Sequence, residues 1–185
     1  MSSTFLPSRH QEWQPESAEE RLDHLRSVQQ IQQLPVRYAL AVDSRDMDAL
    51  AELFVENVRV GKQLYGRDEL KRWMTEALGQ LGRTIHLVAN HILSFRDADH
   101  AAGVVYCRDE VEHEQSWTVG HLQYWDTYER RGGRWYFVRR IYNRWAVVDE
   151  IARSNTGFEG QGLTTHELPQ AWPTWDRFHS QIASS

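Results

Sequence analysis

Three residues of this 185-residue sequence could together perform acid–base chemistry: Tyr38, Asp43 and His86. Histidine exchanges protons near neutral pH, and a neighbouring carboxylate can hold the imidazole in one tautomer and stabilise its charged form. A tyrosine hydroxyl can donate a hydrogen bond to a substrate oxygen. If the fold brings these side chains together in an apolar cavity, we expect His86 to be a general base, Asp43 its orienting carboxylate and Tyr38 an acid or hydrogen-bond donor.

Asp43 ends an apolar, helix-like run at residues 39–43. An acidic side chain is unfavourable near a helix C-terminus, where the helix dipole favours cations. Two interpretations stay open: Asp43 starts the turn at residues 43–46 through local backbone hydrogen bonds, or it has a partner elsewhere in the fold. Tyr38 and Asp43 are separated by about 140° around a regular helix. They share a cavity only if the helix loosens near Asp43 or the cavity is wide.

His86 lies in a strand-like segment in which apolar residues alternate. Strict alternation puts His86, Val88, Asn90 and Ile92 on one face and His91 on the other. The first face mixes apolar side chains with His86 and Asn90, which indicates polar groups in a dry cavity. A hydrogen-bonded core histidine is the competing interpretation of His86. The nine histidines include no His-Glu-x-x-His pattern, and no metal site is expected.

Further candidates for substrate binding lie on the predicted strands. His121 could supply a second imidazole, and a hydrogen-bonded histidine at a subunit interface is an equal alternative. Tyr106 and Arg108 share one strand face, and an inward arginine could bind an oxyanion or a phenolate. Arg139, on the fourth predicted strand, could also bind such a group. Arg108 is preferred because it follows an apolar run. For both arginines the alternative is an ion pair on the surface. Asn90, on the same predicted strand face as His86, is a further candidate for substrate binding.

The composition limits the class of protein. Apolar residues make up 41% and charged residues 25%, as in ordinary soluble globular domains. The formal net charge of −5 argues against binding nucleic acid or an anionic membrane surface. The single cysteine, Cys107, excludes an internal disulfide and a cysteine-based zinc site. No apolar stretch approaches the roughly 20 residues of a membrane helix, no signal peptide is recognisable, and a cytoplasmic location is expected.

Two common kinds of cofactor chemistry are also not expected. No glycine-rich phosphate loop follows a predicted strand, which argues against a nucleotide cofactor. Lys62 and Lys71 are the only lysines and lie in polar contexts, which argues against a lysine Schiff base.

The apolar periodicity predicts helices first and strands afterwards. Ser17 and Glu20 form a capping box that starts a helix, and Pro35 is expected to kink this helix or start a new one. Shorter helices are predicted at 47–54 and from about 67 to 81, with a short strand at 57–61 between them. From residue 84 the period changes to two, and a Gly132–Gly133 turn indicates a hairpin. Four long strands are predicted at residues 84–96, 101–113, 117–130 and 134–148. This order predicts an α+β fold with helices packed on one curved, mostly antiparallel sheet.

Three parts of the chain are distinguished by composition. Residues 1–17 are interpreted as a flexible arm and residues 18–152 as the folded domain. Residues 153–185 contain glycine, proline and scattered aromatic residues, and are interpreted as an irregular tail with apolar anchors. The tail could lie across the sheet, close the pocket or contact a partner subunit.

Three segments carry a family resemblance. Residues 30–54 (QIQQLPVRYALAVDSRDMDALAELF), 84–91 (TIHLVANH) and 126–137 (DTYERRGGRWYF) resemble the SnoaL-like branch of the nuclear-transport-factor-2-like superfamily. The resemblance covers about two-thirds of the chain and is more specific for the fold than for the activity. It implies a cone-shaped α+β barrel whose open end is a ligand pocket, and homo-oligomers, dimers or trimers, that pair through the outer face of the sheet.

The resemblance also implies a cofactor-free activity. Enzymes of this branch include scytalone dehydratase, a hexachlorocyclohexane dehydrochlorinase and bile-acid dehydratase, and they use an Asp–His pair, often with a Tyr on the same helix. In this sequence Asp43, His86 and Tyr38 match those positions. We therefore expect a lyase of the dehydratase or elimination type that acts on a small hydrophobic, aromatic or steroid-like ring compound. Two alternatives use the same base: retro-aldol cleavage that releases formaldehyde, and isomerisation. A third is a non-catalytic ligand-binding module or a ring-hydroxylating dioxygenase β-type subunit.

Overall fold

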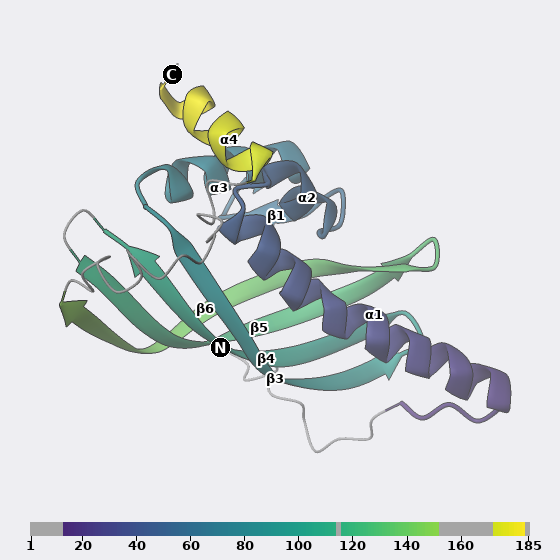
Figure 1. Cartoon of the computed structure of the whole chain (residues 1–185). Helices are drawn as coiled ribbons and strands as arrows, with labels where there is room; N and C mark the ends of the chain where they lie inside the picture. Colours follow the sequence, from purple (N-terminus) through teal and green to yellow (C-terminus); the bar gives the residue numbers. More distant parts are fainter. Residues whose placement is uncertain (1–12, 114–115, 152–171, 184–185) are drawn as a thin grey trace, which may run out of the picture.

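A curved four-stranded sheet and one long helix dominate the structure, a computed structural model that describes residues 13–113, 116–151 and 172–183 (Figure 1). The helices are α1 (Ala18–Asp43), α2 (Met47–Glu52), α3 (Arg67–Gly79) and α4 (Pro173–Ala183). The strands are β1 (Arg59–Val60), β2 (Leu64–Tyr65), β3 (Thr84–Asp97), β4 (His100–Glu112), β5 (Ser116–Arg131) and β6 (Arg134–Ile151). Most of the predicted arm, residues 1–12, and residues 152–171 of the predicted tail lie outside the described residues.

Helix α1 begins at the predicted capping box. The Ser17 side chain accepts a hydrogen bond from the Glu20 backbone N–H at 3.1 Å, and the Glu20 carboxylate accepts one from the Ser17 backbone N–H at 2.9 Å. The helix then continues through Pro35 to Asp43, and Pro35 itself is buried. The expectation that a new helix starts at Pro35 is therefore wrong. One uninterrupted helix carries both Tyr38 and Asp43.

The four long strands form one antiparallel sheet in the order β3-β4-β5-β6. Their bounds lie within three residues of the predicted strands. The hairpin between β5 and β6 turns at Gly132 and Gly133, whose φ angles are 57° and 78°. Both angles lie in the left-handed region, which glycine adopts without steric cost and which matches the twist of a two-residue hairpin.

Irregular pairing in β3 and β6 changes which side chains face α1. Between the pairs Val88↔Cys107 and His91↔Val105, strand β3 has two residues where β4 has one. Such a bulge moves the following side chains to the other face of the sheet. His91 therefore lies on the same face as His86, and the expectation that these two histidines point to opposite faces is wrong.

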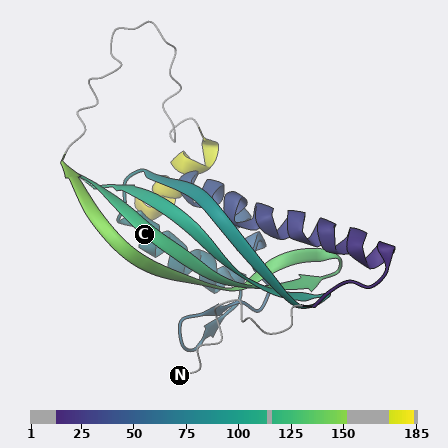
Figure 2. The same cartoon turned by 90° about the horizontal axis from the view of Figure 1, so that it is seen from below.

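The core lies between the sheet and the helices. Helix α1 runs along one side of the four strands in both views, and α2, α3 and α4 gather near its C-terminal end (Figures 1 and 2). The largest fully buried apolar side chains, those of Ile31, Leu50, Tyr128, Trp135 and Phe137, come from α1, α2, β5 and β6. This arrangement confirms the predicted α+β class with helices packed on a curved antiparallel sheet.

The C-terminal segment differs from the expected irregular tail, because residues 173–183 form helix α4. Its side chains Trp175 and Phe178 are buried.

On the sheet, Ile85, Leu87 and Trp145 are exposed apolar side chains. The oligomeric state and the cytoplasmic location stay predictions. None of the helices in the described part of the chain is long and apolar enough to span a membrane.

Candidate active site

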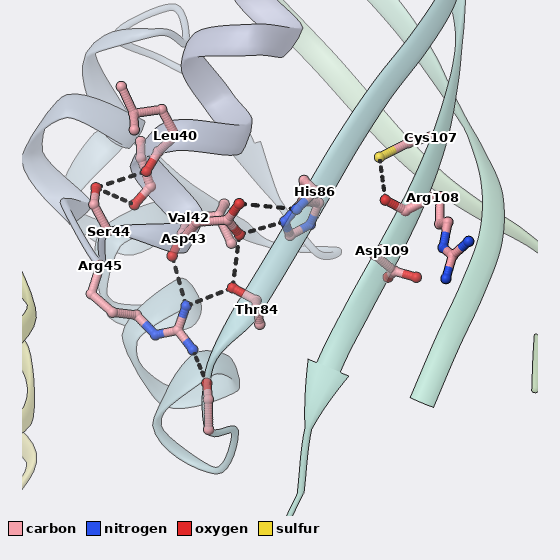
Figure 3. A network of polar contacts seen from close by, with 12 residues as sticks. Leu40, Val42, Asp43, Ser44, Arg45, Thr84, His86, Cys107, Arg108 and Asp109 are labelled. Carbon is pink, nitrogen blue, oxygen red and sulfur yellow. Dashed lines mark hydrogen bonds and ion pairs between the residues drawn. The ribbon is translucent and has the colours of Figure 1, made fainter. Parts of the chain in front are cut away.

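The side chains of Asp43 and His86 meet between the end of α1 and the start of β3 (Figure 3). Asp43 Oδ1 lies 2.7 Å from His86 Nδ1, and Asp43 Oδ2 accepts a hydrogen bond from the His86 backbone N–H at 2.9 Å. The two side chains are 15% and 9% exposed. The carboxylate therefore fixes both the ring of His86 and the strand that carries it.

Thr84 and Arg45 complete the surroundings of the carboxylate. The Thr84 hydroxyl lies 2.8 Å from Asp43 Oδ1, and Arg45 Nη1 donates a hydrogen bond to the Thr84 hydroxyl oxygen at 2.9 Å. Because a guanidinium has no acceptor, the hydroxyl must direct its own hydrogen to Asp43. The carboxylate thus accepts three hydrogen bonds, which offsets the unfavourable helix dipole at this position.

The two interpretations of Asp43 can now be compared. No side-chain hydrogen bond joins Asp43 to the turn that follows it in the described structure. Asp46 caps the next helix, since its Oδ1 accepts from the Ala49 backbone N–H at 3.0 Å. Asp43 therefore has the distant partners, Thr84 and His86.

This hydrogen-bond pattern determines the tautomer that suits His86. Because both oxygens of Asp43 act as acceptors, the hydrogen between the side chains belongs on Nδ1. The other ring nitrogen, Nε2, then carries a lone pair, and no described residue forms a hydrogen bond with it. A neutral imidazole held in this way can accept a proton from a bound molecule.

Apolar side chains continue from His86 along the same face of the sheet. Val88 packs with the buried cluster of Cys107, Leu122 and Tyr124, as does Tyr38 of α1. Burial raises the pKa of Tyr38, and this effect exceeds the opposing influence of Arg140. The Tyr38 hydroxyl therefore keeps its proton at neutral pH and can donate a hydrogen bond.

Arg140 lies against three aromatic rings. Its Cζ atom is 4.4 Å from the ring centre of Tyr38, 4.0 Å from that of Tyr124 and 4.4 Å from that of Phe137. Its Nε and Nη2 atoms donate hydrogen bonds to Asp126 at 2.9 and 2.8 Å, and the two charged side chains are 5% and 0% exposed. Burial opposes the charge of Arg140, but the Asp126 carboxylate outweighs it and the pKa of Arg140 is raised.

One donor of Arg140 is unused: Nη1 is buried and has no hydrogen-bond partner among the described residues. An unpaired buried donor is unfavourable, and it is the kind of group that a bound oxygen atom would satisfy. The same face of the sheet thus carries an imidazole, that of His86, and a cationic hydrogen-bond donor, Arg140.

Two more side chains extend this network. The Tyr128 hydroxyl donates to Asp126 Oδ2 at 2.9 Å, and His91 Nε2 lies 3.1 Å from the same hydroxyl. Since the Tyr128 hydrogen is directed to Asp126, His91 must donate from Nε2. Burial lowers the pKa of His91 to about 4, so this imidazole is neutral at physiological pH.

Residues 23–141 match the family model of the SnoaL-like domain. The chain belongs to the SnoaL-like domain family. An uncharacterized protein of Mycobacterium tuberculosis is 29% identical to this SnoaL-like chain over 121 residues, which are 60% of the chain and 81% of that protein. An uncharacterized protein of Mycobacterium bovis matches to the same extent.

Solved structures show the same fold at low identity. A proposed scytalone dehydratase from Novosphingobium aromaticivorans aligns with a TM-score of 0.62 and 22% identity, covering 72% of this SnoaL-like chain and 93% of the other. A hexachlorocyclohexane dehydrochlorinase from Novosphingobium barchaimii aligns with a TM-score of 0.63 and 22% identity, covering 70% and 94%. At this level of identity the similarity shows the fold, and the chemistry must be argued from the residues of this SnoaL-like site.

The structure does not bring the four secondary candidates to His86 Nε2. Asn90 is exposed and lies in the bulge of β3. Tyr106 packs on Trp145 with ring centres 5.3 Å apart. Arg108 forms an ion pair with Glu110 at 3.0 Å, and the exposed His121 is its cross-strand neighbour. Paired residues of a sheet share a face, and strand neighbours alternate. Arg108 and His121 therefore lie on the face opposite that of Asp109, the cross-strand partner of His86.

Sequence reasoning missed Arg140 because β6 also has a bulge. Thr127 pairs with Arg139 and Tyr128 with Phe137, so Val138 is an extra residue that turns Arg140 toward α1. Arg139 is exposed. Strict alternation from the buried Phe137 would have favoured Arg139. The residue types along β6 do not indicate that the alternation shifts at Val138.

The remaining features carry no comparable chemistry. A surface groove of about 400 Å³ lies between α3 and α4 and contains neither Asp43 nor His86. Within the described residues, no group of three or more His, Cys, Asp or Glu side chains could hold a metal ion. The Asp43–His86 pair therefore stays the candidate site in this part of the chain.

Proposed function

We propose that this SnoaL-like protein is a cofactor-free lyase of the dehydratase or elimination type. The observation that supports the proposal most strongly is the 2.7 Å contact between Asp43 Oδ1 and His86 Nδ1, which leaves Nε2 as a proton acceptor. The apolar side chains beside His86 suit a small hydrophobic ring substrate. The fold similarity to a proposed scytalone dehydratase and to a dehydrochlorinase raises the expectation of this class but does not identify the reaction.

In the proposed reaction, His86 Nε2 removes a proton from a carbon atom of the substrate. The electrons of that C–H bond form a double bond to the neighbouring carbon, from which the leaving group departs. Asp43 stabilises the imidazolium that forms, as a buried carboxylate can. When hydroxide leaves, the proton of the imidazolium completes a water molecule and restores His86. The net reaction is loss of water, and it needs no other reactant.

Tyr38 and Arg140 are suited to the oxygen atoms of such a substrate. Tyr38 stays protonated because burial raises its pKa, and Arg140 Nη1 has no described partner. Hydrogen bonds from these donors would stabilise negative charge on a carbonyl or leaving oxygen as it develops. We therefore favour a substrate with at least one oxygen on its ring. Substrate binding by Asn90, Tyr106, Arg108 and His121 was expected from the sequence, but it is not part of the proposed mechanism.

The test is a substrate panel that includes a cyclic β-hydroxyketone, a halogenated cyclohexane and a hydroxymethyl-substituted phenol. Mass spectrometry detects loss of water or hydrogen halide, a formaldehyde assay detects retro-aldol cleavage, and deuterium exchange from solvent detects isomerisation. Elimination by the wild-type chain that is lost in His86→Gln and kept in His121→Gln would support the proposal. Formaldehyde release or isomerisation would move the same base to a different reaction. Tight binding without any turnover or exchange would contradict an enzymatic function and favour a ligand-binding module.

A further inference from the structure

Helix α4 contacts the end of α1 at Arg45, two residues after Asp43. Arg45 is 2% exposed although it is charged. Its Cζ atom lies 4.9 Å from the ring centre of Trp175 and 5.8 Å from that of Phe178, both on α4. These rings cover the guanidinium and attract its positive charge. Burial lowers the pKa of Arg45 to about 10, while Asp43 opposes this effect, so Arg45 is a cation at neutral pH.

The guanidinium of Arg45 points toward Thr84, which contacts Asp43 (Figure 3). Nη1 donates to the Val42 carbonyl at 2.7 Å as well as to the Thr84 hydroxyl, and Nη2 donates to the Gly82 carbonyl. A continuous set of contacts thus leads from the rings of α4 through Arg45 and Thr84 to Asp43. The last of these residues holds His86.

The backbone of Arg45 indicates that its side chain matters. Its φ angle is 58°, in the left-handed region that favours glycine. Arginine has no conformational advantage at this position, so its contribution there is the guanidinium. Helix α4 makes two further contacts, one with the end of α1 and one with α3. Thr174 Oγ1 donates to the Ser44 carbonyl at 2.7 Å, and Ile182 lies so close to Gly79 that a Cβ atom there would be 2.8 Å from its Cδ1.

We propose that Arg45 is a positioning residue for the Asp43–His86 pair and that α4 holds Arg45 in place. The inference rests on the proposed function in one respect only, namely that His86 acts as a base. Arg45 occupies the acceptor side of the Thr84 hydroxyl and so directs the hydroxyl hydrogen to Asp43. Asp43 then remains an acceptor, and the hydrogen on His86 stays at Nδ1. Without the rings of α4, water reaches Arg45 and the guanidinium can leave Thr84.

The position of the hydrogen on His86 can be measured without a substrate. We would record nuclear magnetic resonance spectra of the full chain with isotope-labelled histidine, and assign His86 as the signal lost in His86→Gln. In the wild type we expect one tautomer, with a slowly exchanging Nδ1–H. In Trp175→Leu and Arg45→Gln we expect this hydrogen to exchange about tenfold faster or more, as for loss of one hydrogen bond to a charged group.

Matched variants separate this effect from general loosening of the fold. Ile182→Ala removes a contact of α4 with α3 but none with Arg45, and should keep the wild-type exchange rate. Thr84→Val keeps the shape of the threonine and removes the hydroxyl, so it should reproduce the effect of Arg45→Gln. Thr84→Ser keeps the hydroxyl, so the Nδ1 hydrogen of His86 should exchange as slowly as in the wild type. If Arg45→Gln does not fold, the exchange rate measured in Thr84→Val tests the inference instead. Folded Thr84→Val and Trp175→Leu variants with the wild-type His86 signal would overturn the inference.

Activity provides a second measurement with a separate meaning. On a substrate found in the panel above, Trp175→Leu should lower kcat about tenfold and leave KM within about twofold, because Trp175 acts on the base rather than on substrate binding. If the His86 signal responds to α4 but no substrate is turned over, the coupling stands and the proposed lyase function fails. If His86→Gln abolishes turnover while α4 variants change neither the signal nor kcat, the lyase function stands and the coupling fails.

Discussion

Asp43 contacts His86 at two points: its Oδ1 atom lies 2.7 Å from the ring nitrogen Nδ1, and its Oδ2 atom accepts from the backbone N–H at 2.9 Å. The second contact joins the end of α1 to β3 and fixes where the strand lies relative to the helix. The first fixes the orientation of the ring. A single carboxylate thus sets both the position of the proposed base and its tautomer.

Asp43→Asn should separate these two effects. The asparagine amide oxygen can still accept from the His86 backbone N–H, but its NH2 group can donate to His86 Nδ1 and so favour the tautomer with hydrogen on Nε2. That tautomer cannot accept a proton at Nε2, so kcat should fall by about 10²–10⁴-fold, the range typical of general-base loss. Steady-state kinetics and thermal unfolding would be measured together. Asp46→Asn is the control, because asparagine also caps helices well, and it should leave kcat unchanged. Equal losses in both variants would contradict the role of Asp43.

The half-buried His91 should make the protein sensitive to mild acid. Its pKa is about 4 in the fold because burial disfavours the charged ring, whereas an exposed histidine has a pKa of about 6.5. Between these values the unfolded chain binds a proton that the folded chain does not. The free energy of unfolding should therefore be greatest above pH 6.5 and fall as the pH drops to 4, by at most about 3 kcal/mol.

Urea denaturation at several pH values tests this, with His91→Gln as the variant that cannot titrate and can still donate to Tyr128. The loss of stability between pH 6.5 and 4 should be smaller in His91→Gln than in the wild type. His121→Gln, at an exposed position, should behave like the wild type. The same pH slope in all three proteins would show that another group causes the acid sensitivity.

The sequence predicted the elements well because their signals are local. The capping box at Ser17, the change of period at Thr84 and the Gly132–Gly133 turn each depend on a few neighbouring residues. Asp43 and His86 were chosen by residue type and resemblance, and the structure brings their side chains into contact. Their catalytic roles stay predictions.

The expectations that failed depend on the whole sheet. The bulges in β3 and β6 shift the alternation by one residue, which moves His91 to the face of His86 and selects Arg140 instead of Arg139. A bulge helps a sheet to bend around its core, so its position follows from tertiary packing rather than from local alternation. Helix α4 was missed for a similar reason, since Trp175 and Phe178 are buried only against other elements.

The buried charges of Asp126 and Arg140 should depend on each other for their effect on the free energy of unfolding. Both side chains are almost completely buried, and removal of one leaves the other charge without compensation. Asp126→Asn should therefore lower the free energy of unfolding by about 3 kcal/mol or more. In the double variant Asp126→Asn/Arg140→Met, the loss should be smaller than the sum of the two single losses by about 1–3 kcal/mol. Denaturant unfolding of the four proteins completes the cycle, and additive losses would show that the charges do not depend on one another.

Gly120 should be required for the position of Asp109, the cross-strand partner of His86. A Cβ atom at Gly120 would lie 1.9 Å from Asp109 Oδ1 and 3.0 Å from its Cγ, so the carboxylate would have to move. Asp109 is buried, and its Oδ2 accepts a hydrogen bond from the Tyr142 hydroxyl at 3.1 Å, which leaves it little freedom. Gly120→Ala should lower the free energy of unfolding by about 1–3 kcal/mol, as overpacking in a core does.

Asp109→Ser in the same chain makes room for the new methyl group, so the double variant should regain part of that loss. Gly132→Ala is unsuitable as a control because its φ is 57°; Ala102→Gly, on the same strand as Asp109 but at a half-buried site, tests the effect of backbone freedom alone. If the double variant is no more stable than Gly120→Ala, the conflict lies with the backbone and not with the Asp109 carboxylate.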